Sequence, residues 1–259
     1  MKNTDKPKDE WGEHAEGYDK WYLKFNGAVE NYVDWEILKK YLPENKKAKI
    51  LDAAGGTGRI TLPLARLGYD ITICDLSAAM LDVARRKLEK EGLIDKVEII
   101  ECDVRSLPFE NESFDFVLCW YGGYGALKEL VRVAKKGGRV SLFLNNKWLS
   151  LIDKFKDSPE KILATADSQP CFMEDRGEKY LVVTPDEAGE MLESEGIKVH
   201  DIYAVCGWAN QLGFPGETLE SDEWDDRLFK QTTEMVLRLS RERSVMGMSR
   251  HLMAYGEKI

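Results

Sequence analysis

The chain has 259 residues and a formal charge of −9; 43% of its residues are hydrophobic and 32% are charged. At about 150 residues per domain, this length allows one large or two small domains, and we expect one elaborated globular domain. The charge argues against binding of nucleic acid through bulk positive charge, although a local basic face stays open. No apolar run approaches the roughly 20 residues of a membrane span, and the polar, charged start of the chain is unlike a signal peptide. We therefore expect a cytoplasmic protein with no membrane partner.

The cysteines do not predict a metal site. They are scattered, without a Cys-x-x-Cys pair or a histidine at zinc-ligand spacing. Structural thiols in a reducing compartment are the simplest interpretation.

Two helical patterns come first in the chain. Residues 11–25 carry aromatic side chains at spacings of three and four, which predicts an aromatic stripe on one helical face. Residues 28–42 form a second helical pattern that stops before Pro43. The simplest interpretation is that these aromatic residues pack the helices onto a sheet.

The stretch 50–58, Ile-Leu-Asp-Ala-Ala-Gly-Gly-Thr-Gly, contains the end of a strand and a tight turn, and a helix is expected to follow at 59–65. Glycines accept backbone angles closed to other residues and carry no Cβ, so a ligand can lie against the main chain there. A second strand at 68–75 ends in Asp75, at roughly the 20-residue offset where open α/β nucleotide sites place a ribose-binding carboxylate. The alternative is that Asp75 caps the amphipathic helix expected at 78–90, for which Ser77 is the more usual cap.

Phosphate-binding interpretations fit the turn poorly. Thr61 stands where a dinucleotide fingerprint has its third glycine, and Arg59-Ile60 stands where a P-loop has Lys-Ser/Thr. Asp52, beside the turn, would repel a pyrophosphate and would suit a ligand with a cationic end. A nicotinamide oxidoreductase is therefore disfavoured.

At this point the chain resembles the class I S-adenosylmethionine-dependent methyltransferases. Residues 51–58 and 74–81 are similar to the first and second motifs of that family. Residues 101–104 resemble the segment whose acidic residue meets the adenine amino group, 114–120 the fourth strand, and 130–140 the helix, Gly-Gly turn and fifth strand. The resemblance covers about residues 48–145, with one departure: Ala54 stands where the family usually has its first glycine.

The resemblance implies an α/β fold with a Rossmann-like, doubly wound, seven-stranded sheet that is mostly parallel with an antiparallel last strand. It implies an N-terminal helical lid at 1–45, a cofactor-binding core at 46–145, and substrate-side inserts with the final two strands at 146–259. The implied cofactor is S-adenosyl-L-methionine. The implied cofactor-binding residues are Asp52, Ala54, Gly55, Gly56, Gly58, Asp75, Leu76, Met80, Asp103, Val104 and Trp120.

Four tyrosines are candidates for the substrate side. In the resembled family the N-terminal helices often fold over the cofactor pocket, which makes Tyr18 and Tyr22 lid candidates. The loop after the fourth strand contributes Tyr121 and Tyr124 among three glycines, and it is shorter than in many family members. Trp120 either packs against the cofactor, which we prefer, or belongs to a purely structural turn.

The last part of the chain has a less regular pattern. We expect helices at 147–155, 159–167, 185–195 and about 219–243, and strands at 179–184, 197–205 and 250–258. This layout is similar to that of the bacterial transferases that methylate the carboxymethoxy group on the wobble uridine of tRNA. A local basic surface for such a substrate would use Arg238, Arg241, Arg243 and Arg250, with Lys147, Lys154 and Lys156.

The resemblance implies transfer of a methyl group by in-line displacement, with a small-molecule acceptor favoured. A tRNA-modifying enzyme acting on a wobble-uridine carboxylate is the alternative, and a non-catalytic S-adenosyl nucleotide-binding or regulatory protein is the alternative of another class. Alignment of acceptor, methyl and sulfur supplies much of the rate, so no catalytic residue is strictly required. Among the histidines, His14 lies on the expected lid, whereas His200 and His251 fall in late strands and are expected to be structural.

Overall fold

The computed structural model describes residues 11–120, 124–175, 178–205 and 225–259. Five parallel strands form the centre of the sheet in the order β3-β2-β1-β4-β5. Their bounds are Lys49–Ala53 (β1), Asp70–Asp75 (β2), Val97–Glu101 (β3), Phe114–Cys119 (β4) and Ala134–Asn146 (β5). The strand order reverses between β1 and β4, and ligands of open α/β sheets bind beyond the carboxyl ends of the strands at such a point.

The central strands form because short apolar runs can be buried on both faces of the sheet. In β1 only Lys49 is exposed, and in β4 every residue but Asp115 is buried. Such runs are typical of parallel strands that helices cover on either side.

Two further strands complete the expected seven, within a sheet that has nine strands in the described residues. β9 (His251–Lys258) pairs antiparallel with β5 on one side and with β8 (Ile197–Val205) on the other. β8 therefore runs parallel to β5, and the expected mostly parallel sheet with an antiparallel last strand is confirmed.

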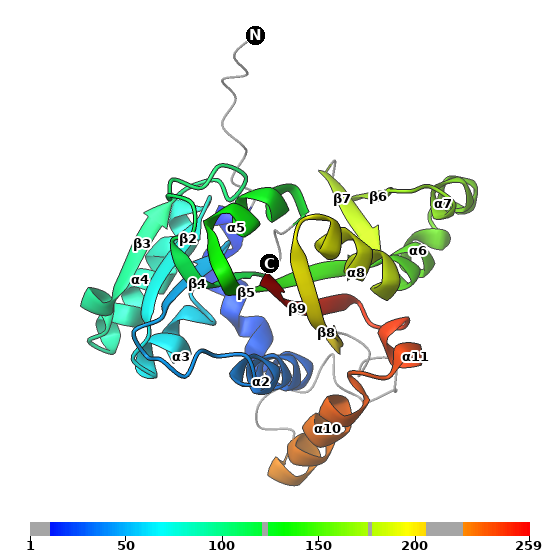
Figure 1. The fold of residues 1–259 in the computed structure, drawn as a ribbon. Helices are drawn as coiled ribbons and strands as arrows, with labels where there is room; N and C mark the ends of the chain where they lie inside the picture. Colours follow the sequence, from blue (N-terminus) through cyan, green and yellow to red (C-terminus); the bar gives the residue numbers. More distant parts are fainter. Residues whose placement is uncertain (1–10, 121–123, 176–177, 206–224) are drawn as a thin grey trace.

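A hairpin was not expected from the sequence. β6 (Cys171–Asp175) pairs antiparallel with β7 (Glu178–Val183), and β7 pairs with the last two residues of β5. The sequence predicted β7 to within one residue but missed β6, because so short a run ending in two acidic residues carries little strand signal. With α6 (Lys147–Phe155) and α7 (Pro159–Ala166), the hairpin lies on the opposite side of the molecule from β3 (Figure 1).

Most helices follow the expected ranges. α4 (Ala78–Lys90) and α6 match them residue for residue, whereas α3 (Thr61–Arg66) begins two residues late. α8 (Pro185–Ser194) starts in a capping box in which Thr184 and Glu187 bond each other's backbone N–H. The expected helix at 219–243 is corrected to α10 (Asp226–Leu239) and a separate turn, α11 (Arg243–Met246), while 219–224 lie outside the described residues. No helix in the described ranges is both long and apolar enough to span a membrane.

The expected single helix at 11–25 is wrong. The segment is broken into η1 (Gly12–His14), α1 (Ala15–Tyr18) and η2 (Asp19–Leu23), and α2 (Phe25–Lys39) follows after Lys24 in extended conformation. Glycines at 12 and 17 weaken a continuous helix. Packing then decides the path: a Cβ on Gly27 would lie 2.1 Å from the Trp21 carbonyl oxygen, so η2 lies directly on the start of α2.

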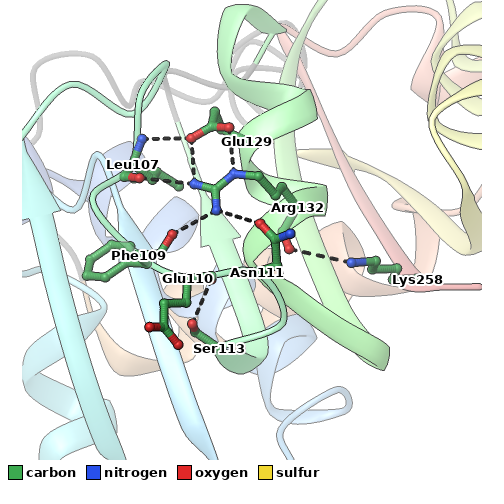
Figure 2. Close-up of polar contacts among 8 residues, drawn as sticks. All are labelled: Leu107, Phe109, Glu110, Asn111, Ser113, Glu129, Arg132 and Lys258. Atoms are coloured by element: carbon green, nitrogen blue, oxygen red, sulfur yellow. Dashed lines mark hydrogen bonds and ion pairs between the residues drawn. The ribbon is translucent and has the colours of Figure 1, made fainter.

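Arg132 on α5 (Leu127–Val133) holds the connection between β3 and β4 (Figure 2). Its guanidinium donates to the carbonyl oxygens of Leu107 and Phe109 at 3.0 and 2.7 Å. It also bonds Glu129, whose carboxylate accepts from the Leu107 N–H at 2.9 Å. The segment that follows Asp103 is thereby fixed to the body of the fold.

Candidate functional site

The glycine loop that follows β1 has the strained backbone expected of a ligand cradle. Ala54, Gly56 and Gly58 have φ values of 56°, 54° and 72°, in the left-handed region. A Cβ on Gly56 would meet no atom closer than the Met80 Cε at 3.9 Å and the Asp75 Oδ2 at 4.0 Å. A side chain at Gly56 would therefore meet two of the residues expected to bind the cofactor at ordinary contact distance, without a clash.

Ala54 is the unusual member of this loop, because L residues other than glycine pay about 1–2 kcal/mol in the left-handed conformation. We expect Ala54→Gly to raise the free energy of unfolding by up to about 1 kcal/mol, after the entropy cost of glycine is subtracted. Ala53→Gly is the matched control: Ala53 is a fully buried strand residue, so the same change should destabilise. Urea unfolding of the three proteins measures both, and equal losses in the two variants would contradict the expectation.

Asp75 is in the place that the sequence predicted, at the end of β2. Its Oδ2 accepts from the Gly56 N–H at 2.9 Å, and its Oδ1 accepts from the Ser77 N–H at 2.9 Å. The side chain of Ser77, not of Asp75, caps α4 by accepting from the Met80 N–H. Asp75 therefore ties the glycine loop to the β2–α4 turn and is only half-buried. Leu76 lies in the same turn, and Met80 is buried beneath the loop.

Asp52 is a buried carboxylate at the carboxyl end of β1. Its Oδ2 accepts from the Thr61 hydroxyl at 2.6 Å. Burial raises the pKa of Asp52 to about 6, against the lowering effects of that hydrogen bond and of the Arg59 charge. At neutral pH the carboxylate is mostly ionised, which places negative charge behind the glycine loop.

This raised pKa has a consequence for stability. Between pH 4 and 6 the folded protein keeps a proton that the unfolded chain, with its ordinary pKa of 3.8, has lost, so this group makes stability fall as pH rises through that window. The loss corresponds to about 3 kcal/mol.

Asp52→Asn cannot ionise and its amide oxygen can still accept from Thr61. We expect the free energy of unfolding of the variant, relative to that of the wild type, to rise by up to about 3 kcal/mol from pH 4 to pH 7.5. Urea unfolding at both pH values tests this; an equal difference at both would contradict it.

Asp103 and Val104 follow β3 on the far side of Asp75. The Asp103 carboxylate is bonded by the Arg105 guanidinium at 2.6 Å, and this ion pair holds the pKa of Asp103 below its usual range. The Cys102 N–H donates to the Asp75 carbonyl oxygen, so the two carboxyl-bearing turns are joined. Val104 is half-buried against the core.

Trp120 is buried at the carboxyl end of β4. Its indole N–H donates to the Ser141 hydroxyl at 3.0 Å, and its ring stacks on Phe143 at 4.7 Å between centroids. Ser141 and Phe143 both belong to β5, so at least one face of the Trp120 ring packs against the sheet, as the structural interpretation of Trp120 expects.

Arg59, which the sequence interpretation did not select, lies at the centre of the site. Its guanidinium is 4.6 Å from the Tyr22 ring centroid and 5.6 Å from that of Trp120. It donates to Asn31 and to the buried Asp34 of α2, at 3.1 and 3.2 Å. Burial raises the pKa of Asp34 to about 8, against the effect of the Arg59 charge. One sequence signal could have identified Arg59: it is a cationic residue directly after the last glycine of the loop, where a P-loop has its lysine.

The N-terminal segment contacts the glycine loop. Asp19 of η2 accepts from the Thr57 hydroxyl and from the Lys87 ammonium, both at 2.7 Å. Tyr18 packs edge-on against Tyr22, 6.2 Å between ring centroids, and Tyr22 lies against Arg59. These two lid candidates therefore adjoin the loop. Tyr121 lies outside the described residues, and Tyr124 begins the short turn η4 (Tyr124–Ala126).

The expected basic surface is not supported by the arginines. Each of them bonds a carboxylate: Arg238 with Glu234, Arg241 with Asp201, Arg243 with Asp186, and Arg250 with Asp153. Lys147 is buried beside Glu187. His200 and His251 lie in β8 and β9 as expected, and burial lowers the pKa of His251 to about 4.

The geometry suits a ligand with a ribose and a cationic end. Because Gly56 carries no Cβ, a nucleoside could approach the Asp75 carboxylate along the main chain there. Asp103 and Val104 follow β3, the neighbouring strand of β2 in the sheet. Asp52 and Asp75 supply negative charge on the side of β1, where a positive group would be attracted. In the described ranges, no group of three or more His, Cys, Asp or Glu side chains is arranged to hold a metal ion.

Comparison with known proteins bears on this site. Residues 50–138 match a family described as a methyltransferase domain. Ubiquinone/menaquinone biosynthesis C-methyltransferase UbiE of Bartonella henselae is 37% identical over 119 residues, 42% of this chain and 46% of the relative. The tRNA 5-carboxymethoxyuridine methyltransferase of Escherichia coli strain K12 is 33% identical over 134 residues, 48% of this chain and 51% of the relative. The chain thus spans about half the length of the curated relatives it matches.

The fold has relatives among solved structures. A SAM-dependent methyltransferase from Thermotoga maritima aligns with 96% of this chain and 98% of its own, with a TM-score of 0.58 and 18% identity. At that identity the likeness concerns the fold alone, and it confirms the expected fold class.

Proposed function

We propose that this chain, a member of the class I S-adenosylmethionine-dependent methyltransferase family through its residues 50–138, transfers a methyl group from S-adenosylmethionine to a small-molecule acceptor. The observation that carries the proposal is the left-handed glycine loop beside the Asp75 carboxylate, with the Gly56 N–H bonded to that carboxylate at 2.9 Å. In this proposal residues 1–45 cover the site, 46–145 bind the cofactor and 146–259 form the substrate side.

The residues present would divide the work of binding. Asp75 would accept hydrogen bonds from the ribose hydroxyls, Asp103 and Val104 would meet the adenine, and Asp52 would face positive charge. Bound S-adenosylmethionine supplies a methyl group already activated by a positively charged sulfur. The chain then has to orient the acceptor in line with that methyl and exclude water. The Thr57 hydroxyl bonds Asp19 of η2, and in this proposal that bond holds η2 over the glycine loop so that η2 helps to exclude water.

The charge distribution favours a small acceptor over RNA. Formal charge is −9, and the four arginines expected on a basic face are each neutralised by a carboxylate. The second candidate, methylation of a wobble-uridine carboxylate, is favoured by the 33% identity to the Escherichia coli tRNA enzyme. A non-catalytic nucleotide-binding role is favoured by Ala54, which stands where the family usually has its first glycine and holds a left-handed φ of 56° that an alanine adopts less readily than a glycine.

Calorimetric titration with S-adenosylmethionine, S-adenosylhomocysteine and NAD tests the cofactor. We expect binding of the two sulfur nucleotides and not of NAD. Incubation with methyl-labelled S-adenosylmethionine and either a small-metabolite extract or bulk tRNA then tests the acceptor, with label expected in the small-molecule fraction. Label in tRNA would support the second candidate. Binding without turnover in either fraction would support the non-catalytic role, and tight binding of NAD alone would overturn the proposal.

A further inference from the structure

Asn26 is a buried amide that makes no side-chain hydrogen bond with the described residues. The residue is 6% exposed, and neither its Oδ1 nor its Nδ2 has a partner. Asn146 shows the usual arrangement: it is fully buried, its Nδ2 donates to the Met246 carbonyl, and its Oδ1 accepts from the Trp148 N–H at 3.2 Å. Buried polar groups in folded proteins are nearly always paired, because an unpaired one costs free energy. The unpaired amide of Asn26 therefore calls for a partner that the described part of the chain does not supply.

Asn26 lies on the side of α2 that faces the sheet. Val33 and Ile37 follow it by seven and eleven residues, which puts all three on one helical face, and both apolar residues are buried in the core. The chain after α2 reaches Tyr41, whose ring stacks on Tyr255 and whose carbonyl oxygen accepts from Arg139. Arg139 pairs with Phe116 near the beginning of β4, so this end of α2 lies toward the amino ends of the central strands.

The other end of α2 lies beyond the carboxyl ends of the strands. Arg59 directly follows the glycine loop, and it bonds Asn31 and Asp34 in the middle of α2. Asn26 is more than a turn further toward the start of the helix, on the side away from Tyr41. The first turn of α2 therefore lies over the edge of the sheet where the candidate site is.

The proposed function, on which this inference rests, fixes which part of the cofactor comes near this turn. Asp75 ends β2 and Asp103 follows β3, so the ribose and adenine lie over those two strands. The other end of the molecule must then extend over β1 and β4. That end carries an α-amino-acid group, an ammonium next to a carboxylate.

The side chains at this edge of the sheet match such a group. An amide offers an acceptor and two donors side by side, so one asparagine can bond an ammonium and a carboxylate at the same time. Asp52 at the end of β1 and Arg59 beyond the glycine loop add one charge of each sign. We propose that Asn26 binds the amino-acid end of S-adenosylmethionine, its Oδ1 accepting from the ammonium and its Nδ2 donating to the carboxylate.

Two ligands of known structure separate this subsite from the rest of the cofactor site. S-adenosylhomocysteine carries the amino-acid end, whereas 5′-methylthioadenosine keeps the adenosine and the thioether but lacks it. We expect Asn26→Leu to weaken S-adenosylhomocysteine binding by about 10- to 100-fold in calorimetry, the range of a lost hydrogen bond to charged groups. The affinity for 5′-methylthioadenosine should stay within about twofold. Asn26→Ala repeats the test with a smaller side chain.

Stability provides the control. Asn26→Leu removes no side-chain hydrogen bond found among the described residues, so its Tm should be equal to or above that of the wild type. Asn146→Leu removes satisfied bonds and should lower the Tm without changing the ratio of the two affinities. An equal loss of affinity for both ligands in the Asn26 variants, or no loss for either, would overturn the proposal. Failure of the wild type to bind S-adenosylhomocysteine would overturn the proposed function itself, and that result is visible before any variant is made.

Discussion

Asp75→Ala is expected to weaken S-adenosylmethionine and S-adenosylhomocysteine binding by about 100-fold or more, because it removes the charged acceptor for two ribose hydroxyls. It also removes the acceptor for the Gly56 and Ser77 N–H groups, so the glycine loop loses its tie to the β2–α4 turn. The loss of these backbone bonds should lower the free energy of unfolding by about 1–3 kcal/mol. Calorimetric titration together with urea unfolding measures both effects.

Two further variants separate the binding role of Asp75 from its structural one. Asp75→Asn keeps one acceptor oxygen, so its affinity should fall between those of the wild type and Asp75→Ala. Asp70→Ala changes an exposed aspartate at the opposite end of the same strand and should leave affinity within about twofold. Unchanged affinity in a folded Asp75→Ala protein would refute the ribose assignment.

Gly27→Ala should have the second large effect, on the N-terminal segment. The new Cβ would lie 2.1 Å from the Trp21 carbonyl oxygen and 2.9 Å from the Tyr22 Cα, and backbone atoms cannot turn aside as a side chain can. We expect a loss of about 3 kcal/mol in the free energy of unfolding, or separation of η2 from α2 at a similar cost. Separation would expose the chain around Lys20 and Lys24, which trypsin digestion of the otherwise folded protein detects.

The lid assignment can be tested with the same variant. Asp19 reaches Thr57 only while η2 is seated, so separation should also weaken S-adenosylhomocysteine binding. Gly17→Ala is the matched control on the same segment, since no atom lies within 4 Å of its added Cβ. Alanine in a helix costs about 1 kcal/mol less than glycine, so this control should be neutral or stabilising. Equal trypsin cleavage rates in the two variants would rule out the steric account.

The sequence determined the central strands of the sheet and the part of the site that lies on them. Glycines at 55, 56 and 58 and the acid that ends β2 are adjacent to strands whose apolar runs are buried on both faces, so the position of each side chain follows from the strand alone. α4 was predicted to its last residue for a related reason: its amphipathic period and the Ser77 cap are local signals.

Contacts between distant segments decided the rest. The break at 11–25 depends on how closely Gly27 approaches η2, and the pairing of the late arginines with carboxylates depends on residues up to 97 positions away. Arg59 belongs to the site because folding brings Tyr22, Trp120 and α2 into contact with it, and these contacts cannot be predicted from the sequence around residue 59. The missing partners of Asn26 could not be inferred from any local pattern, because whether a buried amide is satisfied is a property of the whole packed neighbourhood. The strands and their loop were therefore encoded locally, whereas the cover of the site was settled by tertiary packing.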